Sequence, residues 1–301
     1  FMPTIVILFM CLSILEDSGY MARAAFLMDK PLRKIGLNGR SFIPMMMGFG
    51  CTVPAVMSAR SMSSRRDRRF TILLTPFMSC GAKVPVYALF AKAFFSGNLV
   101  LVMSCLYLGG ILMAIIAGLI LKHLLFHGDA APFIMELPAY RLPTPRNVIR
   151  TMWDKAKDFI QRAFTVIFLA TVIVWFLQSF TFRFETAATV QESMLGTLAG
   201  LIAPLFKPLG FGSLEASTAI LTGIMAKESV VSTLAVLAGV DMNSAAMLTA
   251  LQGVFSSIAA AIAFLTFVLL YMPCVAAFAA MKRELESRRW AIAAVCGQTC
   301  V

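Results

Sequence analysis

Apolar runs about as long as a membrane is thick recur along the chain, separated by short polar stretches. Two of them, Leu99–Leu121 and Ala163–Phe180, approach the ~20 residues that a helix needs to cross the hydrocarbon core of a bilayer. Because such runs return from one end of the sequence to the other, one cleaved signal peptide does not explain them. The pattern predicts an all-α, polytopic transmembrane helical bundle with roughly seven to nine membrane segments.

Basic residues gather in four clusters: Lys30–Arg40, Arg60–Arg69, Lys122–Arg162 and Lys282–Arg289. Because Lys and Arg mark the cytoplasmic loops of membrane proteins, we expect Arg60–Arg69, the densest cluster, inside the cell. From there Phe70–Phe95 can cross outward to a turn at Ser96–Asn98, and Leu99–Leu125 can return. Ser244–Ala280 is long enough to cross and lead into the fourth cluster. The charge pattern therefore predicts that the second, third and fourth clusters face the cytoplasm.

Residues 131–162 form a predicted cytoplasmic connector. Four prolines, at positions 132, 138, 143 and 145, make its first part extended. From Arg146 onward, apolar residues such as Val148 and Ile149 recur at helical spacing with basic residues between them, which predicts an amphipathic helix. Two locations stay open for this helix: the interface of the bilayer, or the cytoplasmic surface against a partner domain.

Composition narrows the class of protein. Hydrophobic residues make up 59% of the 301 residues and charged residues 14%, whereas soluble domains carry about 25% charged residues. The net charge is +11, from 26 basic and 15 acidic residues. A basic protein can bind nucleic acid, but these charges lie in short loops between apolar runs, so we interpret them as topological signals. The seven cysteines are an odd number and lie mostly in apolar segments, which does not indicate a disulfide framework.

Three short stretches place a cysteine beside residues that break helices. In "PMMMGFGCTVPAVMS", Cys51 lies among Gly48, Gly50 and Pro54. We expect these residues to interrupt helical hydrogen bonding. Backbone groups freed at membrane depth are tolerated where they face protein or a wet cavity. The stretch therefore predicts a broken helix beside a polar route.

The other two stretches have the same arrangement: "TPFMSCGAKVP" sets Pro76, Gly81 and Pro85 around Ser79, Cys80 and Lys83, and "YMPCVAAF" joins Pro273 to Cys274. A thiolate beside unwound carbonyls can serve as a transient ligand for a soft or borderline transition metal. A buried cysteine can equally act as a small hydrophobe. The recurrence of three cysteines in one setting favours the ligand role.

Charged residues embedded in apolar segments are a second kind of candidate, because a charge there costs from ~2.5 kcal/mol upward. "LEDSGYMARAAFLMD" holds Glu16, Asp17 and Arg23, and "AILTGIMAKESVVSTLAVLAG" holds Lys227 and Glu228. Two roles stay open for the second pair: the two residues can pair locally as structural elements, or Glu228 can line a polar route.

Gly19–Arg23 and Gly223–Lys227 share the pattern Gly-x-Met-Ala-basic, and a Cys/Pro element follows each, at Cys51 and at Cys274. Two matches in the same order predict an internal repeat, an arrangement typical of transporters whose site lies at the membrane midplane. Catalysis is not indicated, since the sequence has no P-loop, dinucleotide-binding fingerprint or HExxH. His123 and His127 have helical spacing without a nearby carboxylate, so we interpret them as a surface pair.

These elements resemble the ferrous iron transport protein B (FeoB) family of bacterial iron importers. The stretches that carry the resemblance are "LEDSGYMARAAFLMD", "GLNGRSFIPMMMGFGCTVPAVMSAR", "PFMSCGAKVPVYALFA", "PFIMELPAY", "MAKESVVSTL" and "YMPCVAAF". They occur in the family's order and cover nearly the whole chain. In "MAKES", Ser229 stands where relatives often have Val.

The resemblance implies two Gate-type membrane modules, at 1–130 and 163–301, on either side of the connector at 131–162. It also implies an N-terminal domain, outside this chain, that binds GTP and Mg. Phe1 and Val301 both lie inside apolar runs, so we expect the chain to be part of a longer protein, with the second module truncated. No cofactor is expected to bind stably to the chain itself.

The resemblance also implies an iron route along the Gate-motif cysteines, with an acidic element beside them. The candidate ligands of transported Fe(II) are Cys51, Cys80, Cys274, Ser79, Glu16 and Asp17. The candidate gating or pathway residues are Arg23, Pro54, Lys227 and Glu228. Sulfur ligands by themselves favour copper(I) or zinc over ferrous iron, and the resemblance decides for iron.

The resulting hypothesis is a multi-pass protein of the bacterial inner membrane that imports ferrous iron and is not an enzyme. Its implied partners are the bilayer, its own GTP-binding domain, a small FeoA-like protein and a second copy of itself, without nucleic acid. One alternative is a Gate-type transporter of another divalent metal or of nucleosides. Another alternative is a membrane redox sensor, which needs two thiols close together. The two cysteines with a short spacing in the sequence are Cys296 and Cys300, in the pattern Cys-x-x-x-Cys.

Overall fold

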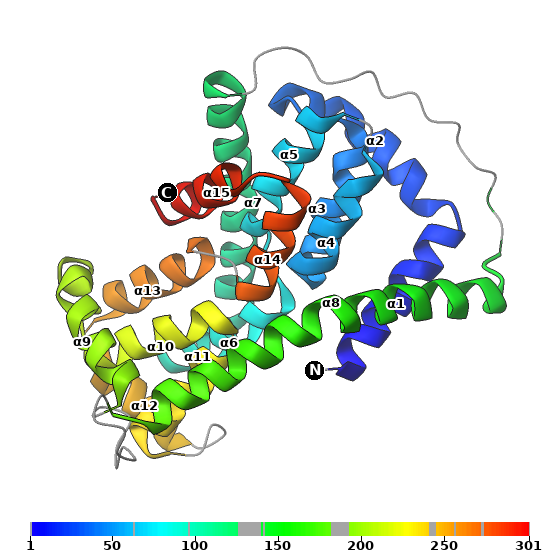
Figure 1. Ribbon diagram of the computed structural model, residues 1–301. Coiled ribbons are helices and arrows are strands. Elements are labelled where there is room, and N and C mark those ends of the chain that lie inside the picture. Colours follow the sequence, from blue (N-terminus) through cyan, green and yellow to red (C-terminus); the bar gives the residue numbers. More distant parts are fainter. Residues whose placement is uncertain are drawn as a thin grey trace. The chain divides into compact units, whose positions relative to one another are not determined.

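A computed structural model of the chain describes residues 2–62, 64–95, 97–125, 140, 142–181, 193–240, 245–255, 257–271 and 274–300 (Figure 1). Every regular element among these residues is a helix, which confirms the predicted all-α class. The first half contains α1 (Met2–Asp17), α2 (Tyr20–Ile35), η1 (Gly39–Ser41), α3 (Phe42–Gly50), α4 (Thr52–Ser58), η2 (Ala59–Ser61), α5 (Arg65–Leu74), η3 (Thr75–Phe77), η4 (Gly81–Lys83), α6 (Val84–Phe94) and α7 (Leu99–Leu124). The second half contains α8 (Pro145–Ser179), α9 (Met194–Phe206), η5 (Lys207–Leu209), α10 (Leu214–Met225), α11 (Ser229–Ala238), α12 (Ala245–Val254), α13 (Ile258–Leu270), α14 (Val275–Glu284) and α15 (Arg288–Cys300).

Local signals in the sequence set several helix boundaries. Four helices begin at a serine whose hydroxyl accepts a hydrogen bond from the backbone N–H three residues on: Ser64, Ser193, Ser213 and Ser257. Gly36 ends α2 in the left-handed conformation, with φ 93°, where a residue without Cβ avoids strain. The boundaries of these helices therefore follow from nearby residues alone.

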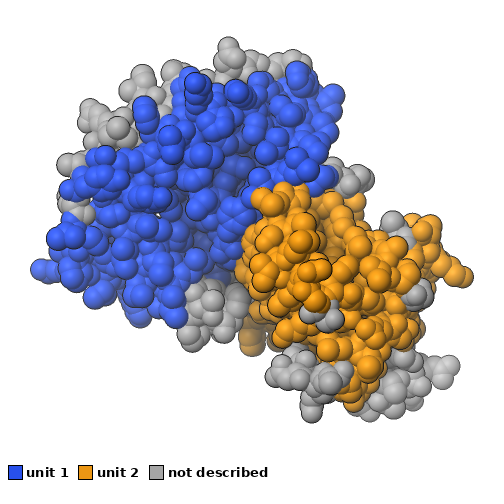
Figure 2. Space-filling model, turned by 180° about the vertical axis from the view of Figure 1, so that it is seen from behind, with its two compact units in different colours: residues 1–80, 111–165, 279–294 blue, residues 81–110, 166–278, 295–301 orange. Residues whose placement is uncertain are grey.

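The chain divides into two compact units, coloured separately in Figure 2. The first unit comprises Phe1–Cys80, Ile111–Thr165 and Ala279–Ala294; the second comprises Gly81–Gly110, Val166–Phe278 and Val295–Val301. These units are defined by contacts within the fold, whereas the predicted modules at 1–130 and 163–301 rest on sequence repetition. The module boundaries therefore stay a prediction.

Close approach of helices holds the first unit together. A Cβ added at Gly118 of α7 would lie 2.6 Å from Ile35 Cγ2, so glycine is needed there for α7 to pack against the end of α2. Thr71 Oγ1 of α5 donates a buried hydrogen bond to Ser41 Oγ, 2.8 Å away. A small residue and a satisfied hydroxyl pair are what helices use to associate in a bilayer.

An aromatic core holds the second unit together. Phe90 of α6 is fully buried and meets Phe255 and Phe264 with ring centroids 5.1 and 5.2 Å apart. Gln252 Nε2 donates a hydrogen bond to Ala93 O at 2.8 Å, which ties the end of α6 to α12. Helix α6 is thereby surrounded by α11, α12 and α13.

Three described helical runs are long and apolar enough to cross a membrane: Arg65–Phe94, Leu99–Leu124 and Ile258–Glu284. The first two agree with the spans predicted at Phe70–Phe95 and Leu99–Leu125. The third begins later than the predicted start at Ser244, because α12 and α13 are separate helices. The total of seven to nine membrane segments stays a prediction.

Helix α8 differs from the prediction in one respect. It runs without a break over 35 residues, so the predicted amphipathic helix and the predicted span Ala163–Phe180 are a single helix. In its first part Val148 is buried, while Ile149 and Trp153 are exposed. Exposed apolar side chains of this kind fit both locations left open above, a bilayer interface and a partner surface.

The turn between α6 and α7 allows a test of topology. Gly97 is exposed and has open space where a side chain would begin, so cysteine fits there; Ser96 lies outside the described residues. We expect Gly97→Cys to react with a membrane-impermeant thiol reagent added to intact cells, above the labelling of the parent. The matched control is Lys282→Cys, which is exposed in the predicted cytoplasmic cluster and should react after the membrane is disrupted. A reversed pattern would overturn the assigned orientation.

Candidate functional site

The predicted break at Cys51 is confirmed. Cys51 has φ −150° and ψ 131°, an extended conformation that ends α3 and precedes α4. Its N–H donates to Met47 O at 3.0 Å, the last helical bond of α3. Pro54 lies in the first turn of α4, where the missing N–H of proline costs no helical hydrogen bond. The thiol of Cys51 is therefore half-buried at a junction of two short helices.

The glycines before Cys51 act differently from the prediction. Gly48 lies inside α3 rather than breaking it, whereas Gly50 is the last residue of α3, directly before the break. A Cβ at Gly48 would lie 3.2 Å from Met78 Cβ, so this glycine lets α3 pack against the segment that precedes Cys80. Both α3 and α4 contact η3. The helix breaks at Cys51 and Cys80 are therefore neighbours in the first unit.

The predicted break at Cys80 is also confirmed. After η3, Met78 is extended, and neither Ser79 nor Cys80 is helical. Ser79 is 1% exposed and Cys80 is half-buried. Pro85 lies in the first turn of α6, so the chain resumes a helix directly after the break. A serine and a cysteine thus stand on non-helical backbone inside an otherwise helical run.

Cys274 belongs to the second unit, at a third break. Helix α13 ends at Leu270, and Tyr271 is extended, with ψ 167°. Cys274 directly precedes α14 and is half-buried. Met272 and Pro273 lie outside the described residues. Each of the three candidate cysteines is therefore non-helical in a helical protein, as the sequence predicted.

The acidic candidates at the end of α1 hold the start of α8. Asp17 accepts hydrogen bonds from the backbone N–H of Thr144 at 3.0 Å and from Asn147 Nδ2 at 2.7 Å. Glu16 forms an ion pair with Lys155. The two carboxylates are thus already engaged with α8, which is a structural role. Whether they also meet a metal stays a prediction.

Arg23, the basic candidate of α2, is engaged in the same part of the first unit. Its guanidinium lies 3.8 Å from the centroid of the Tyr140 ring, a cation–π contact. Arg23 therefore helps to fix residue 140 near α2.

A cavity of about 600 Å³ in the first unit brings Glu16 and Pro54 together. Its walls are largely apolar, and its charged lining residues are Glu16, Arg40, Arg60 and Lys155. Lys155 pairs with Glu16 and Arg60 pairs with Glu284, so most of the charge around the cavity is held in ion pairs. Cys51 and Cys80 are not among the lining residues.

Lys227 and Glu228, the second pair of embedded charges, differ in burial. Lys227, in the break between α10 and α11, is 3% exposed, whereas Glu228 is exposed. Lys227 Nζ lies 3.2 Å from the centroid of the Tyr271 ring and 3.4 Å from Tyr271 O. The contacts of Lys227 therefore point toward the end of α13.

Lys83 is a second buried lysine, which lies at the predicted break beside Cys80 and is not among the candidate site residues predicted from the sequence. It ends η4, three residues after Cys80, and is 3% exposed. Its Nζ donates a hydrogen bond to Leu269 O at 2.8 Å. The signal that could have found it is a lone cation between Gly81 and Pro85 in an apolar stretch.

The two stretches that matched in the sequence adopt different conformations. Gly19 separates α1 from α2 with φ 79°, whereas Gly223 lies inside α10. Arg23 is helical, whereas Lys227 lies outside both flanking helices. The local match therefore does not extend to local structure, and the internal repeat stays a prediction. Among the described residues, no group of three or more His, Cys, Asp or Glu side chains is placed to hold a metal ion.

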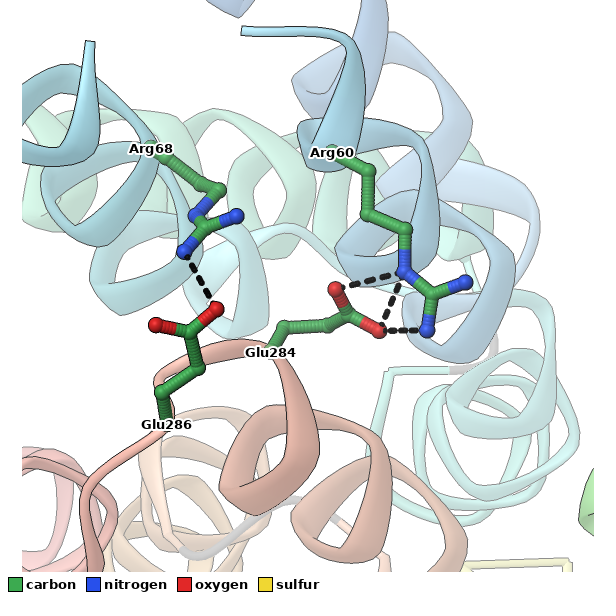
Figure 3. Close-up of polar contacts among 4 residues, drawn as sticks. All are labelled: Arg60, Arg68, Glu284 and Glu286. Carbon is green, nitrogen blue, oxygen red and sulfur yellow. Dashed lines mark hydrogen bonds and ion pairs between the residues drawn. The ribbon is translucent and has the colours of Figure 1, made fainter. Parts of the chain in front are cut away.

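Residues of the basic cluster Arg60–Arg69 contact the end of α14 (Figure 3). Arg60 Nε lies 2.7 Å from both carboxylate oxygens of Glu284, which is 5% exposed. Arg68 Nη2 lies 3.2 Å from Glu286 Oε1, where Glu286 is 55% exposed. One ion pair is thus buried on its acidic side, and the other is open to solvent.

We expect Glu284→Gln to lower the free energy of unfolding by about 1.5–2 kcal/mol, because it removes a charged partner of Arg60. The melting temperature in detergent should fall by about 5 °C. Glu286→Gln is the matched control; an exposed pair contributes about 0–1 kcal/mol, so its melting temperature should stay near that of the parent. Equal shifts in the two variants would contradict the assigned difference in burial.

Comparisons with known proteins identify relatives along nearly the whole chain. The Gate family model, described as nucleoside recognition, matches residues 1–94 and 160–288. The family model described as ferrous iron transport protein B C terminus matches residues 103–155. No solved structure matches the chain.

Three curated relatives illustrate the similarity. The Fe(2+) transporter FeoB of Staphylococcus aureus (strain COL) is 43% identical over 98% of this chain and 44% of its own length. The FeoB of Salmonella typhimurium is 38% identical over 96% of this chain and 44% of its own length. A Porphyromonas gingivalis protein named as a fusion of Fe(2+) transport protein A and Fe(2+) transporter FeoB is 38% identical over 97% of this chain and 40% of its own length. The chain thus spans less than half the length of these relatives.

Proposed function

Because this chain belongs to the Gate family and to the ferrous iron transport protein B family, we propose that it forms the membrane-embedded part of a ferrous iron importer. The observation that carries the proposal is the position of Cys51, Cys80 and Cys274 at three helix breaks. Thiolates and the carbonyl oxygens of unwound backbone together form a mixed ligand set that ferrous iron accepts in passing. Ser79, Glu16 and Asp17 complete the proposed set of ligands.

We further propose a direction for iron transport and a cellular location for the protein. We place the protein in the bacterial inner membrane, with the basic clusters on the cytoplasmic side. An inside-negative potential then favours entry of a divalent cation, by ~2.3 kcal/mol per charge per 100 mV. No enzymatic reaction within this chain is part of the proposal.

Control of the route is proposed to involve Arg23, Pro54, Lys227 and Glu228, in two Gate-type modules at 1–130 and 163–301. Lys227 lies in the α10–α11 break and Pro54 lines the cavity of the first unit, which supports their inclusion. A GTP-binding domain outside the chain, with its Mg, is proposed to regulate transport. The name of the Porphyromonas gingivalis fusion protein supports a FeoA-like protein as a partner.

A second candidate function is transport of another divalent metal or of nucleosides. The description of the Gate family model as nucleoside recognition favours the nucleoside variant. Uptake of iron, zinc, manganese and a radiolabelled nucleoside into the same proteoliposomes separates the candidates. Nucleoside uptake that iron does not affect would favour the second function.

The main test replaces each of the three cysteines by serine in the full-length protein in liposomes. Serine nearly keeps the volume but removes the soft, readily ionised sulfur, so we expect Fe(II) uptake to fall about tenfold in Cys51→Ser, Cys80→Ser and Cys274→Ser. Protein levels and melting temperatures should stay close to those of the parent.

Cys105 provides the matched control, because it is exposed on the unbroken helix α7 and should carry iron normally as serine. A packing role predicts a different pattern: Cys→Ala is tolerated in transport, and Cys→Ser lowers stability by burying a hydroxyl. If all four serine variants import iron like the parent, the thiol route is wrong. If the parent itself imports no iron, the proposed function is wrong.

A further inference from the structure

Two buried ammonium groups point at the same helix end in the second unit. Lys83 Nζ donates to Leu269 O at 2.8 Å, and Lys227 Nζ lies 3.4 Å from Tyr271 O. Both lysines are 3% exposed. Their acceptors are carbonyls at the carboxyl end of α13, and the lysines come from two separate breaks in the chain.

This helix end attracts cations for a general reason. The last four carbonyls of a helix have no partner within it, and the helix dipole gives them a partial negative charge. Tyr271 N donates to Phe267 O, so the carbonyls of Leu269 and Tyr271 lie beyond the last helical bond of α13. In membrane transporters, helix ends and unwound carbonyls of this kind coordinate cations. The lysines therefore stand where a mobile cation could bind.

The ring of Tyr271 adds to the attraction. Lys227 Nζ lies 3.2 Å from its centroid, and the face of an aromatic ring is negative. The ring is held in place by stacking on Phe267, with centroids 5.2 Å apart and planes 15° apart. It is therefore a fixed wall of the cation site.

Structural needs alone do not explain two lysines. Each charge embedded at membrane depth is expensive, and two like charges directed at one helix end repel each other. A neutral donor would satisfy each carbonyl without the cost of burying a charge. Costly local arrangements of this kind occur where function requires them.

Lys83 and Lys227 both lie on segments of the backbone that can change conformation. Lys83 ends η4, which follows the non-helical residues Ser79 and Cys80, and Lys227 lies between α10 and α11. Backbone without a continuous helical ladder can change conformation without breaking a long helix. The acceptors, by contrast, are Leu269 in α13 and Tyr271 directly after it, and both residues pack in the core of the second unit.

We propose that the carboxyl end of α13 is a divalent-cation site whose resident occupants are the ammonium groups of Lys83 and Lys227. The lysines are tethered cations that close the route at this helix end, which lies just before Cys274 in the sequence. Withdrawal of either lysine opens the site to the metal. This inference rests on the proposed function and deepens it: it adds Lys83, the carbonyl ligands and a physical basis for closure.

The test uses the full-length protein with Lys83→Met and Lys227→Met, because methionine keeps an apolar stem of similar length without the charge. In detergent, we expect each variant to bind Mn²⁺ at least about tenfold more tightly than the parent, measured by the loss of the EPR signal of unbound Mn²⁺. In liposomes without GTP, Fe(II) leak should rise about tenfold in each. Lys92→Met and Lys207→Met each remove an exposed lysine of the same unit and should behave like the parent.

Unchanged Mn²⁺ affinity in folded methionine variants would overturn the site, and tighter binding without added leak would overturn its role as a plug. If a methionine variant does not fold, the corresponding glutamine variant, which can still donate to the carbonyl, carries the same test. Failure of the proposed function is distinguishable. A parent that imports no iron in the presence of GTP refutes that function, while the Mn²⁺ titration still decides whether the lysines occupy a cation site.

Discussion

Phe90→Ala should lower the free energy of unfolding by about 3–5 kcal/mol, the range expected when a buried aromatic ring is removed and leaves a cavity. Phe90 is fully buried and contacts Phe255, Phe264 and Phe94 with centroid distances of 5.1, 5.2 and 6.2 Å. These rings come from α6, α13 and the end of α12, so the change loosens three helices at once. The melting temperature in detergent should fall by about 10 °C.

The matched control is Phe26→Ala on α2, where the side chain is 57% exposed. Removal of an exposed ring leaves no cavity, so its effect should stay within about 0.5 kcal/mol. A melting temperature of Phe90→Ala close to that of Phe26→Ala would show that the aromatic core does not stabilise the second unit.

Local chemistry made much of the fold predictable. Apolar runs of membrane length gave the helical class, and proline and glycine near Cys51, Cys80 and Cys274 gave the three breaks. Each of these features depends on one continuous stretch of the chain, because the hydrogen bonds of a helix join residues four positions apart. Gly48, which was predicted to interrupt the helix, instead packs against Met78, and the break lies at Cys51 itself.

Contacts between segments that are far apart in the chain could not be predicted from the sequence. Arg60 and Glu284 are 224 positions apart, and Lys83 and Leu269 are 186 apart. Burial of Lys83 is decided by elements far away along the chain, and the residues near Lys83 in the sequence do not reveal which ones those are. The engagement of Glu16 and Asp17 by α8 has the same origin, because their partners lie more than 120 positions away.

The contacts that Glu16 and Asp17 make with α8 affect how substitutions of these two residues are interpreted. Asp17 and Glu16 are candidate ligands because the family resemblance implies an acidic element beside the iron route. Both also hold the start of α8, so their loss can lower transport through structure alone. The cysteines are cleaner probes, because a helix break is already formed by the backbone and a serine preserves its shape.

Gly223→Ala is expected to have the second largest effect, about 3 kcal/mol of lost stability, at the upper end of what overpacking costs. A Cβ at this position would lie 2.3 Å from Tyr271 Oη and 2.5 Å from Val230 Cγ2. Both distances are far below van der Waals contact, and the Tyr271 ring is held by its stacking on Phe267. The strain must therefore move the ring or separate α10 from α13.

The matched control is Gly253→Ala, since Gly253 lies in α12 and nothing is within 4 Å of an added Cβ. Alanine in a helix is better than glycine by about 0.5–1 kcal/mol, so this variant should melt at the same temperature as the parent or slightly higher. Gly223→Ala should melt about 8 °C lower. Because a displaced Tyr271 also withdraws its ring from Lys227, Gly223→Ala should further increase the GTP-independent Fe(II) leak, whereas Gly253→Ala should not. Loss of stability without that leak would mean that the tyrosine ring is not a wall of the cation site.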